Sequence, residues 1–361
     1  MITQEQVLAV LKTIIYPGFQ KDIVSFGFVK DITLQDYSLA LRVEIPSSNP
    51  AVAKELEDSI KAGLDKLGIE NANIDIKMPS LKQETKAPIS AKNIAPTIKH
   101  FVMISSGKGG VGKSTTSVNL AISLAKSGLK VGLLDADIYG PNIPRMMGIQ
   151  DMQPGVSEDG KNLLPIQALG ISVMSIGLLY ESAESLIWRG PMVMRAIEQM
   201  LKDVVWDELD VLVIDMPPGT GDAQLTLAQN VPVSAGVNVS TPQAVAIDDG
   251  ARALDMFKKL NIPIFGVVEN MSGFVCPDTN KVYDIFGSGG CDKLASNFDT
   301  EVVARIPLQP SIVTSSDDGR PISYYSPDSL ASKIYMNLAD KLIDFLKDIT
   351  PSNATIQPTN N

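Results

Sequence analysis

A glycine-rich stretch in the middle of the chain has the spacing of a phosphate-binding loop. Residues Gly107 to Ser114 read G-K-G-G-V-G-K-S, which satisfies the pattern G-x-x-x-x-G-K-[S/T]. Glycines let backbone N–H groups turn inward around phosphate oxygens, where a side chain would collide with them. In such a loop Lys113 contacts the outer phosphates and the Ser114 hydroxyl binds Mg²⁺. We expect nucleotide contacts from Gly107, Lys108, Gly109, Gly110, Val111, Gly112, Lys113, Ser114 and Thr115.

Three aspartates further along the chain follow short apolar runs. Asp135 and Asp137 come after K-V-G-L-L, and Asp215 ends the run V-L-V-I-D. The carboxyl ends of parallel strands meet at one edge of a sheet, where ligands bind in open α/β folds. A P-loop enzyme keeps its acidic Mg²⁺ partner there. Any one of these aspartates could be a helix N-cap, but three at one edge favour function. We therefore expect a magnesium site formed by Ser114, Asp135 and Asp215.

The elements around the loop are those that such a site requires. A buried-type strand precedes it, and a helix follows whose first turn offers unpaired N–H donors and the positive end of its dipole. Seven short, almost wholly apolar runs alternate with helical segments, and they cover residues 100–105, 130–135, 171–177, 210–215, 236–240, 264–269 and 302–307. Strands buried on both faces have this composition. The pattern predicts an α/β fold, a P-loop NTPase with a mostly parallel sheet flanked by helices.

The first 80 residues follow another pattern. Helical spacing at 3–15, a strand-like run at 22–32, strict alternation at 37–45, a four-residue apolar repeat from Val52 to Leu64 and alternation at 72–78 predict the order α-β-β-α-β. Polar residues with three prolines then occupy 79–97, as in a linker. We therefore expect an α+β domain over 1–80, a linker over 81–97, an ATPase domain over 98–348 that ends in a helix, and a disordered tail over 349–361.

Composition excludes several classes of protein. The 361 residues carry 31 Lys and Arg against 41 Asp and Glu, and the net charge of −10 does not suit a general nucleic-acid binder. Two cysteines and one histidine, His100, exclude a disulfide framework and a histidine-rich metal site. No apolar run reaches the ~18 residues of a membrane span, and the first residues lack the features of a signal peptide. We expect a cytoplasmic protein that binds neither nucleic acid nor membrane.

Further motifs identify a family resemblance. Lys108 places a second lysine inside K-G-G-V-G-K-S, which resembles the deviant Walker A loop of the ParA/MinD superfamily of ATPases. The chain also carries D-A-D-I-Y-G-P-N (135–142), M-P-P-G-T-G-D (216–222), V-E-N-M-S (268–272) and D-I-F-G-S-G-G (284–290). Together these resemble the Mrp/ApbC group of ATP-dependent iron–sulfur cluster carriers, over roughly residues 98–346. Residues 17–31 resemble the MIP18-type (DUF59) domain, although that family usually has Asp where Tyr16 stands.

The resemblance implies roles for individual residues. In the family, the lysine that matches Lys108 reaches across a homodimer to the partner's nucleotide. The aspartate that matches Asp137 orients the attacking water, and the asparagine that matches Asn270 reads the adenine. The resemblance thus implies an ATPase that uses ATP and Mg²⁺, with Lys108, Lys113 and Asp137 as catalytic residues. Its implied partners are a second copy of the chain, iron–sulfur apoproteins and scaffold proteins.

The cysteines depart from the family pattern. The family usually has Cys-x-x-Cys after N-M-S, and two subunits pool four thiolates around one [4Fe–4S] cluster; here the run is Cys276-Pro277-Asp278-Thr279. Thr279 cannot supply the thiolate that iron–sulfur ligation requires. Cys276 and Cys291 of two subunits could give four sulfurs, or two Cys276 thiolates could be completed by a small thiol or the client. Alternatively, Cys276 is a remnant and Cys291 a small buried hydrophobe.

Three functions therefore compete. The motifs and Cys276 favour an ATP-dependent iron–sulfur cluster carrier. A ParA/MinD-like ATPase switch without a cluster fits the same nucleotide motifs, but the chain has no basic amphipathic tail for membrane docking. The third alternative is a binding module in which the nucleotide is structural.

Overall fold

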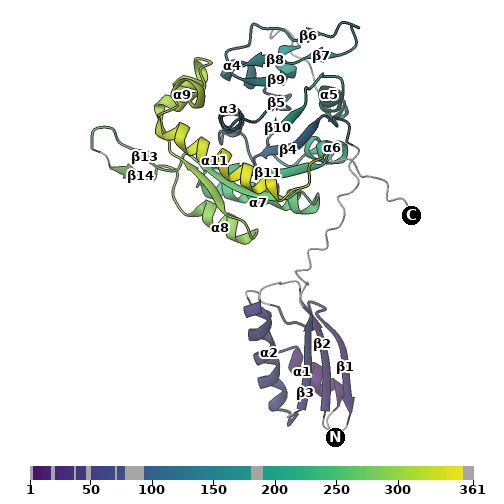
Figure 1. Cartoon of the computed structure of the whole chain (residues 1–361). Helices are drawn as coiled ribbons and strands as arrows, with labels where there is room; N and C mark the ends of the chain where they lie inside the picture. The colour runs from purple at the N-terminus through teal and green to yellow at the C-terminus, as the bar shows by residue number, and fades with distance from the viewer. Residues whose placement is uncertain are drawn as a thin grey trace. The chain divides into compact units, whose positions relative to one another are not determined.

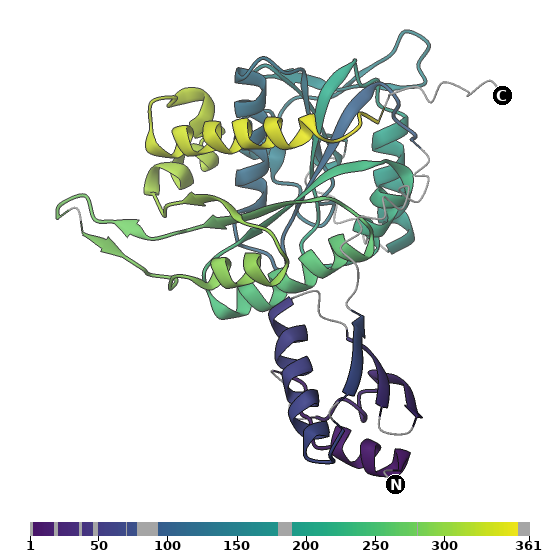
Figure 2. The same cartoon turned by 60° about the horizontal axis from the view of Figure 1, so that its bottom comes forward.

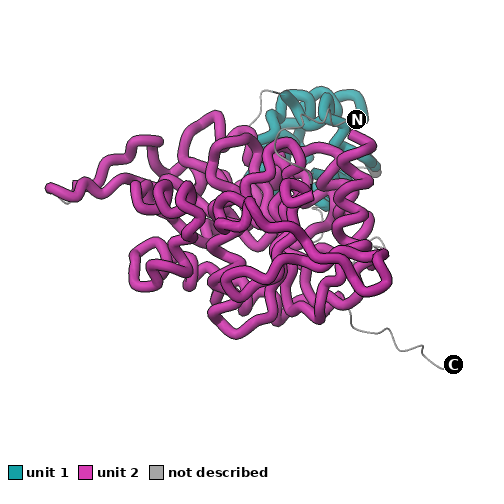
Figure 3. Tube along the Cα trace, turned by 90° about the horizontal axis from the view of Figure 1, so that it is seen from above, with its two compact units in different colours: residues 1–86 teal, residues 87–361 magenta. Residues whose placement is uncertain are grey.

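The chain folds as two compact units, residues 1–86 and 87–361, in a computed structural model (Figure 3). The structure describes residues 3–17, 21–35, 38–45, 50–69, 71–77, 93–179, 190–279 and 281–352. Each unit has its own hydrophobic core.

The N-terminal unit is a three-stranded sheet with two helices. Its elements are α1 (Gln4–Leu11), β1 (Val29–Gln35), β2 (Ser38–Glu44), α2 (Pro50–Asp65) and β3 (Asn71–Lys77). The strand order is β1-β2-β3, with β1 antiparallel and β3 parallel to β2 (Figure 1). Alternating side chains of β2, beginning with the buried Leu39, join Leu56 and Ile60 of α2 in the core. The predicted order α-β-β-α-β is confirmed.

The prediction of a strand over 22–32 is wrong for residues 22–28, because β1 begins only at Val29. The preceding residues form turns. The Asp22 carboxylate accepts hydrogen bonds from the backbone N–H groups of Val24 and Ser25, and Gly27 has a φ of +72°. An aspartate that binds the backbone two and three residues onward favours a turn over an extended strand. The apolar composition of this segment suggested a strand instead.

The C-terminal unit is built on an eight-stranded sheet (Figure 1). Its strands are β4 (Ile98–Ser105), β5 (Val131–Asp135), β8 (Ile166–Ala168), β9 (Ile171–Ser175), β10 (Leu209–Asp215), β11 (Val233–Ser240), β12 (Ile264–Asn270) and β15 (Val302–Ile306). They are ordered β15-β12-β11-β4-β10-β5-β9-β8, all parallel except β8, which is antiparallel to β9. The predicted α/β class is confirmed, and β8 is a strand that the sequence did not indicate.

Helices cover both faces of this sheet. They are α3 (Lys113–Lys126), α4 (Ile143–Met146), α5 (Gly190–Lys202), α6 (Asp222–Asn230), α7 (Ala244–Lys259), α8 (Gly290–Asn297), α9 (Pro310–Asp317), α10 (Ile322–Tyr325) and α11 (Leu330–Lys347), with a 3₁₀ turn at Ile176–Leu178. Helices α3 and α11 pack into one core cluster, and α5, α6, α7 and α8 pack into the other. No described helix is long and apolar enough to cross a membrane.

Two short hairpins interrupt the α/β pattern. They are β6 (Gly155–Val156) with β7 (Leu163–Leu164), and β13 (Phe274–Val275) with β14 (Val282–Tyr283). The β13–β14 hairpin projects from the body of the unit as a narrow arm (Figure 1, Figure 2). Strands of two residues give too weak a periodicity to be detected in the sequence.

The C-terminal unit extends beyond both ends of the expected ATPase domain. Residues 93–97, expected in the linker, pack on this unit, since the N–H of Ile94 donates to the carbonyl of Asn230 and Ala95 is buried. Ser352, expected in the disordered tail, donates its N–H to the carbonyl of Lys99 at 2.7 Å. The remainder of the expected linker from residue 81 to 92, and of the expected tail from 353, lies outside the described residues.

Candidate nucleotide-binding site

The glycine-rich loop connects the central strand β4 to helix α3. Gly110 and Gly112 have φ values of +82° and +89°, a region that other residues rarely adopt. A Cβ atom at Gly112 would lie only 2.0 Å from the side-chain nitrogen of Asn270. A Cβ at Gly107 would lie 2.0 Å from the carbonyl carbon of Asp249 in α7. Gly107 and Gly112 are therefore required by close packing under the loop, and Gly110 by its backbone conformation.

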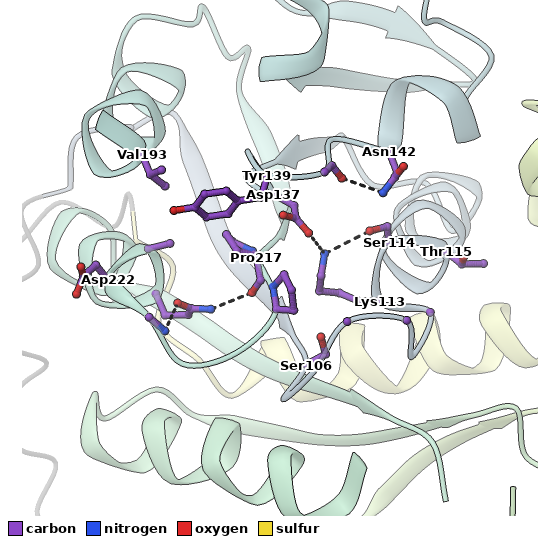
Figure 4. Close-up of a pocket in the computed structure, with 18 of the residues that line it drawn as sticks. Ser106, Lys113, Ser114, Thr115, Asp137, Tyr139, Asn142, Val193, Pro217 and Asp222 are labelled. Atoms are coloured by element: carbon purple, nitrogen blue, oxygen red, sulfur yellow. Dashed lines mark hydrogen bonds and ion pairs between the residues drawn. The ribbon is translucent and has the colours of Figure 1, made fainter. Parts of the chain in front are cut away.

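A cavity of about 660 Å³ opens in front of this loop (Figure 4). Four segments line it: the loop with the start of α3, the β5–α4 connection, the start of α5, and the loop that leads into α6. Its lining residues include Ser106, Gly109, Gly110, Gly112, Lys113, Ser114, Thr115, Asp137, Tyr139, Asn142, Val193, Pro217, Pro218, Gly221 and Gln224. Most of the predicted phosphate loop and Asp137 thus line one cavity. The other predicted residues are not among its lining residues: Gly107, Lys108, Val111, Asp135, Asp215 and Asn270.

Lys113 lies in a buried polar cluster at the base of this cavity. Its side chain is 6% exposed, and its Nζ is 2.7 Å from Asp215 Oδ2 and 3.5 Å from Asp137 Oδ2. Ser114 Oγ donates to the same Asp215 oxygen at 2.7 Å, and Ser117 Oγ donates to the other at 2.6 Å. Both oxygens of the Asp215 carboxylate therefore accept hydrogen bonds, and a hydroxyl and a carboxylate that suit Mg²⁺ lie side by side.

Asp135 lies next to Asp215 but is more deeply enclosed. The two residues end the neighbouring strands β5 and β10 in register. Asp135 has no exposed surface, and its carboxyl group accepts hydrogen bonds from Ser175 Oγ at 2.9 Å and from the N–H groups of Asp137 and Ile143. Burial, together with the nearby charge of Asp215, raises the pKa of Asp135 to about 8. Asp135 thus lies behind the cavity lining, with both of its carboxyl oxygens accepting hydrogen bonds from neighbouring groups.

The side chains near the phosphate loop determine which ligands a metal ion could bind there. Among the described residues, no three His, Cys, Asp or Glu side chains are arranged to hold a metal ion by themselves. Mg²⁺ usually takes one or two protein ligands and completes its shell with phosphate oxygens and water. Ser114 and Asp215 fit that requirement better than the three-residue set that the sequence suggested.

Asn270 and Lys108 differ in burial and in hydrogen bonding. Asn270 ends β12, is 9% exposed, and donates from Nδ2 to the carbonyl of Val111 at 2.8 Å. The side chain expected to read adenine thus packs against the phosphate loop. Lys108 is partly exposed, and within the described parts of the chain its ammonium group has no hydrogen-bond or ion-pair partner.

Several residues of this site were not predicted from the sequence. Ser117, Ser175 and Gln224 all bind groups of the site, but none belongs to the spacing pattern of the loop. Tyr139 lies inside the quoted motif 135–142 and lines the cavity, with 66% of its surface exposed. His100 is outside the cavity lining, with its Nδ1 3.2 Å from Ser234 Oγ, which agrees with its interpretation as a strand residue.

The two cysteines differ sharply in environment. Cys276 follows β13 on the projecting arm, is partly exposed, and donates its N–H to the carbonyl of Lys281 at 3.0 Å. Cys291 lies in the first turn of α8, has no exposed surface and belongs to the hydrophobic core. Burial and the nearby Glu269 raise the pKa of the Cys291 thiol. The structure therefore argues against Cys291 as a cluster ligand, because its thiol could not reach a second subunit without unfolding α8.

We predict that only Cys276 reacts with thiol reagents in the folded protein. A hydrogen bond from the Thr279 hydroxyl favours the thiolate and lowers the pKa of Cys276, so alkylation should reach its plateau at a lower pH than for an ordinary thiol. A chromogenic disulfide reagent should titrate about one thiol per chain in buffer and about two in denaturant. Thr279→Val should move the pH midpoint upward. Two fast thiols in the native chain would contradict the assigned burial of Cys291.

The fold and the site define a P-loop NTPase with a second lysine in its phosphate loop. The family model described as NUBPL iron-transfer P-loop NTPase matches residues 97–343, and a model described as iron–sulfur cluster assembly protein matches residues 4–79. The chain therefore belongs to the NUBPL iron-transfer P-loop NTPase family. The resemblance stated from the motifs is confirmed.

Individual relatives agree with this assignment. The iron–sulfur cluster carrier protein of Helicobacter pylori is 56% identical over 363 residues, covering 99% of this chain and 98% of that protein. That of Escherichia coli K12 is 40% identical, covering 91% and 88%. An Archaeoglobus fulgidus nucleotide-binding protein solved with ADP is 39% identical with a TM-score of 0.54, covering 62% and 88%. The Pyrococcus furiosus cell division ATPase MinD, at 20% identity and a TM-score of 0.50 with 68% and 99% covered, shows the same fold.

Proposed function

We propose that this chain is an ATP-dependent iron–sulfur cluster carrier that binds and hydrolyses ATP with Mg²⁺ and delivers clusters to apoproteins. The observation that carries the proposal is the cluster of Lys113, Ser114 and Asp215 at the base of a cavity walled by the phosphate loop. Family membership and the names of the full-length relatives support the cargo. Cys276 on the projecting arm gives the chain one accessible soft ligand.

The residues of the cavity divide the work of ATP hydrolysis. Backbone N–H groups of residues 107–115 bind the phosphates, and Lys113 transfers its contact from Asp215 to the outer phosphate oxygens. Ser114 and Asp215 would hold Mg²⁺, which supplies charge neutralisation on the phosphates when it is bound. Asp137 orients the attacking water, and burial raises the pKa of its carboxyl group although the nearby Lys113 opposes that shift. Asn270, which donates to the carbonyl of Val111 in the phosphate loop, is the proposed contact for the adenine.

We propose further that the chain works as a homodimer. The support is Lys108, whose ammonium group has no partner among the described residues although it sits in the phosphate loop. A charged lysine at this position could reach a nucleotide bound by a second copy. We propose that the two compact units act as separate domains in the cytoplasm, with scaffold proteins and apoproteins as partners, and that the N-terminal one docks them.

A cluster held by this chain needs ligands from more than one source. Cys291 is enclosed in the core, so the described part of each chain offers only Cys276. Two Cys276 thiolates from a dimer would leave two iron coordination positions for a small thiol or the client's own cysteines. An incompletely ligated cluster suits a carrier, because open positions favour its release to an apoprotein.

Anaerobic reconstitution with iron and sulfide tests whether this chain binds an iron–sulfur cluster. Wild-type protein should gain iron, acid-labile sulfide and the visible absorption and Mössbauer signals of a cluster. Cys276→Ala should lose them, whereas Cys291→Ala should keep them as the matched control. The proposal fails if wild-type protein takes up no cluster, or if Cys276→Ala holds as much iron and sulfide as wild type.

A ParA/MinD-like switch without a cluster is the second candidate. It is favoured by the absence of a second thiol in the run 276–279 and by the burial of Cys291. It predicts normal ATP turnover by a protein that never takes up iron. The reconstitution experiment, combined with turnover measured on the same samples, separates the two.

A further inference from the structure

Residues 217–221 form one wall of the nucleotide cavity, and a buried glutamine holds them. Pro217, Pro218 and Gly221 of this wall line the cavity, and Pro217 lies near Lys113 in the close-up view (Figure 4). Gln224 lies in the first turn of α6 behind the wall and is only 1% exposed. It belongs to none of the sequence motifs that pointed to the site.

The Gln224 amide binds the wall at three points. Its Nε2 donates to the carbonyls of Pro217 and Gly219, both at 3.0 Å, and its Oε1 accepts the N–H of Gly221 at 3.0 Å. A glutamine has two amide hydrogens, so both donors are used on the backbone. Gln224 therefore has no hydrogen left to donate to a nucleotide or a water, although it borders the cavity.

The wall is also attached to the phosphate loop. The N–H of Gly219 donates to the carbonyl of Ser106 at 2.8 Å, and Gly219 has a φ of +93°. One side of Gly219 thus contacts the phosphate loop, and its carbonyl contacts Gln224. The wall begins two residues after Asp215 in the chain, so its position also constrains the carboxylate that binds Lys113.

We propose that Gln224 is a positioning residue for ATP hydrolysis, which fixes residues 217–221 against the phosphate loop. This inference rests on the proposed ATPase function. Nucleotide affinity comes mainly from the phosphate loop and Lys113, which Gln224 does not touch. The wall lines the same cavity as Lys113 and Asp137, which hold the reacting groups in the proposed function, and there geometry governs the chemical step. A displacement of about 1 Å in such a group can reduce the rate about 100-fold.

The test compares Gln224→Glu with Gln229→Glu, an exposed glutamine on the same helix. Gln224→Glu keeps the shape and the acceptor but loses both donors. It should bind ATP within about threefold of wild type while its kcat falls about 10- to 100-fold; Gln229→Glu should match wild type in both. Lowering the pH to about 5 protonates part of the introduced carboxylate and restores one donor, so the kcat deficit relative to wild type should shrink.

Each outcome has a separate meaning. Thermal melting and amide exchange of Gly221 report on the fold and the wall, and exchange should be faster in Gln224→Ala. Unchanged kcat in Gln224→Glu, or a loss of ATP affinity equal to the loss of kcat, would overturn the positioning role alone. A deficit that does not shrink at low pH would overturn the donor argument that supports it. If wild-type protein itself shows no turnover, it is the proposed ATPase function that fails.

Discussion

Replacing Lys113 with methionine should lower ATP affinity and turnover by about 100- to 1,000-fold each. Lys113 is the only lysine that lines the cavity within the described residues, and it contacts Asp215 at 2.7 Å at the cavity base. The variant keeps the aliphatic stem but removes the charge that must neutralise the outer phosphates. Equilibrium binding of a fluorescent ATP analogue and steady-state phosphate release measure the two effects.

The same substitution should also destabilise the protein without nucleotide, which requires a control. Asp215 has no exposed surface, and removing one partner of a buried ion pair typically costs about 3–5 kcal/mol. Ser114 and Ser117 still donate to Asp215, so we expect the lower end of that range. The double variant Lys113→Met with Asp215→Asn should regain melting temperature but not ATP binding. If Lys113→Met binds ATP as wild type does, the lysine has no phosphate role.

Lys108→Ala should keep ATP binding and lose hydrolysis by about 100-fold. Its ammonium group has no partner in the described structure, so its removal should leave the melting temperature unchanged. This separates it from Lys113, whose substitution affects stability and binding together. Binding of the ATP analogue, phosphate release and thermal melting on one preparation check all three expectations.

Mixing two inactive variants tests whether Lys108 acts on the partner's nucleotide. Lys108→Ala and Asp137→Ala should each bind ATP but turn it over slowly. In a mixed homodimer, one nucleotide would meet both an intact Lys108 from the partner and an intact Asp137 from its own chain. An equal mixture should therefore regain about a quarter of the wild-type rate. No recovery, with mixed dimers demonstrated, would assign Lys108 to its own subunit.

The sequence predicted the elements that carry strong local signals. Strands such as β4 and β10 are buried on both faces and read as apolar runs, and the phosphate loop has a fixed spacing between glycines and lysine. The three aspartates could be placed at one sheet edge because parallel strands end there. Short elements such as β13 and β14 carry no comparable pattern.

The remaining features depend on tertiary contacts that composition does not reveal. Asp135 and Asp215 have the same position after an apolar strand, yet one is bound by Ser175 and the other by Lys113. Gln224 binds backbone groups only, and backbone partners leave no trace in the sequence. The burial of Cys291 arises from the packing of α8 on the sheet, which spacing between cysteines cannot indicate.

Binding of Mg·ATP to the intact, folded chain tests the central claim most directly. Isothermal titration calorimetry of wild-type protein in Mg²⁺-containing buffer should show about one ATP per chain, and slow phosphate release should follow on the same sample. Well-folded protein that gives no heat of binding with ATP or ADP would contradict the account at its foundation, because every role proposed for the cavity starts from a bound triphosphate.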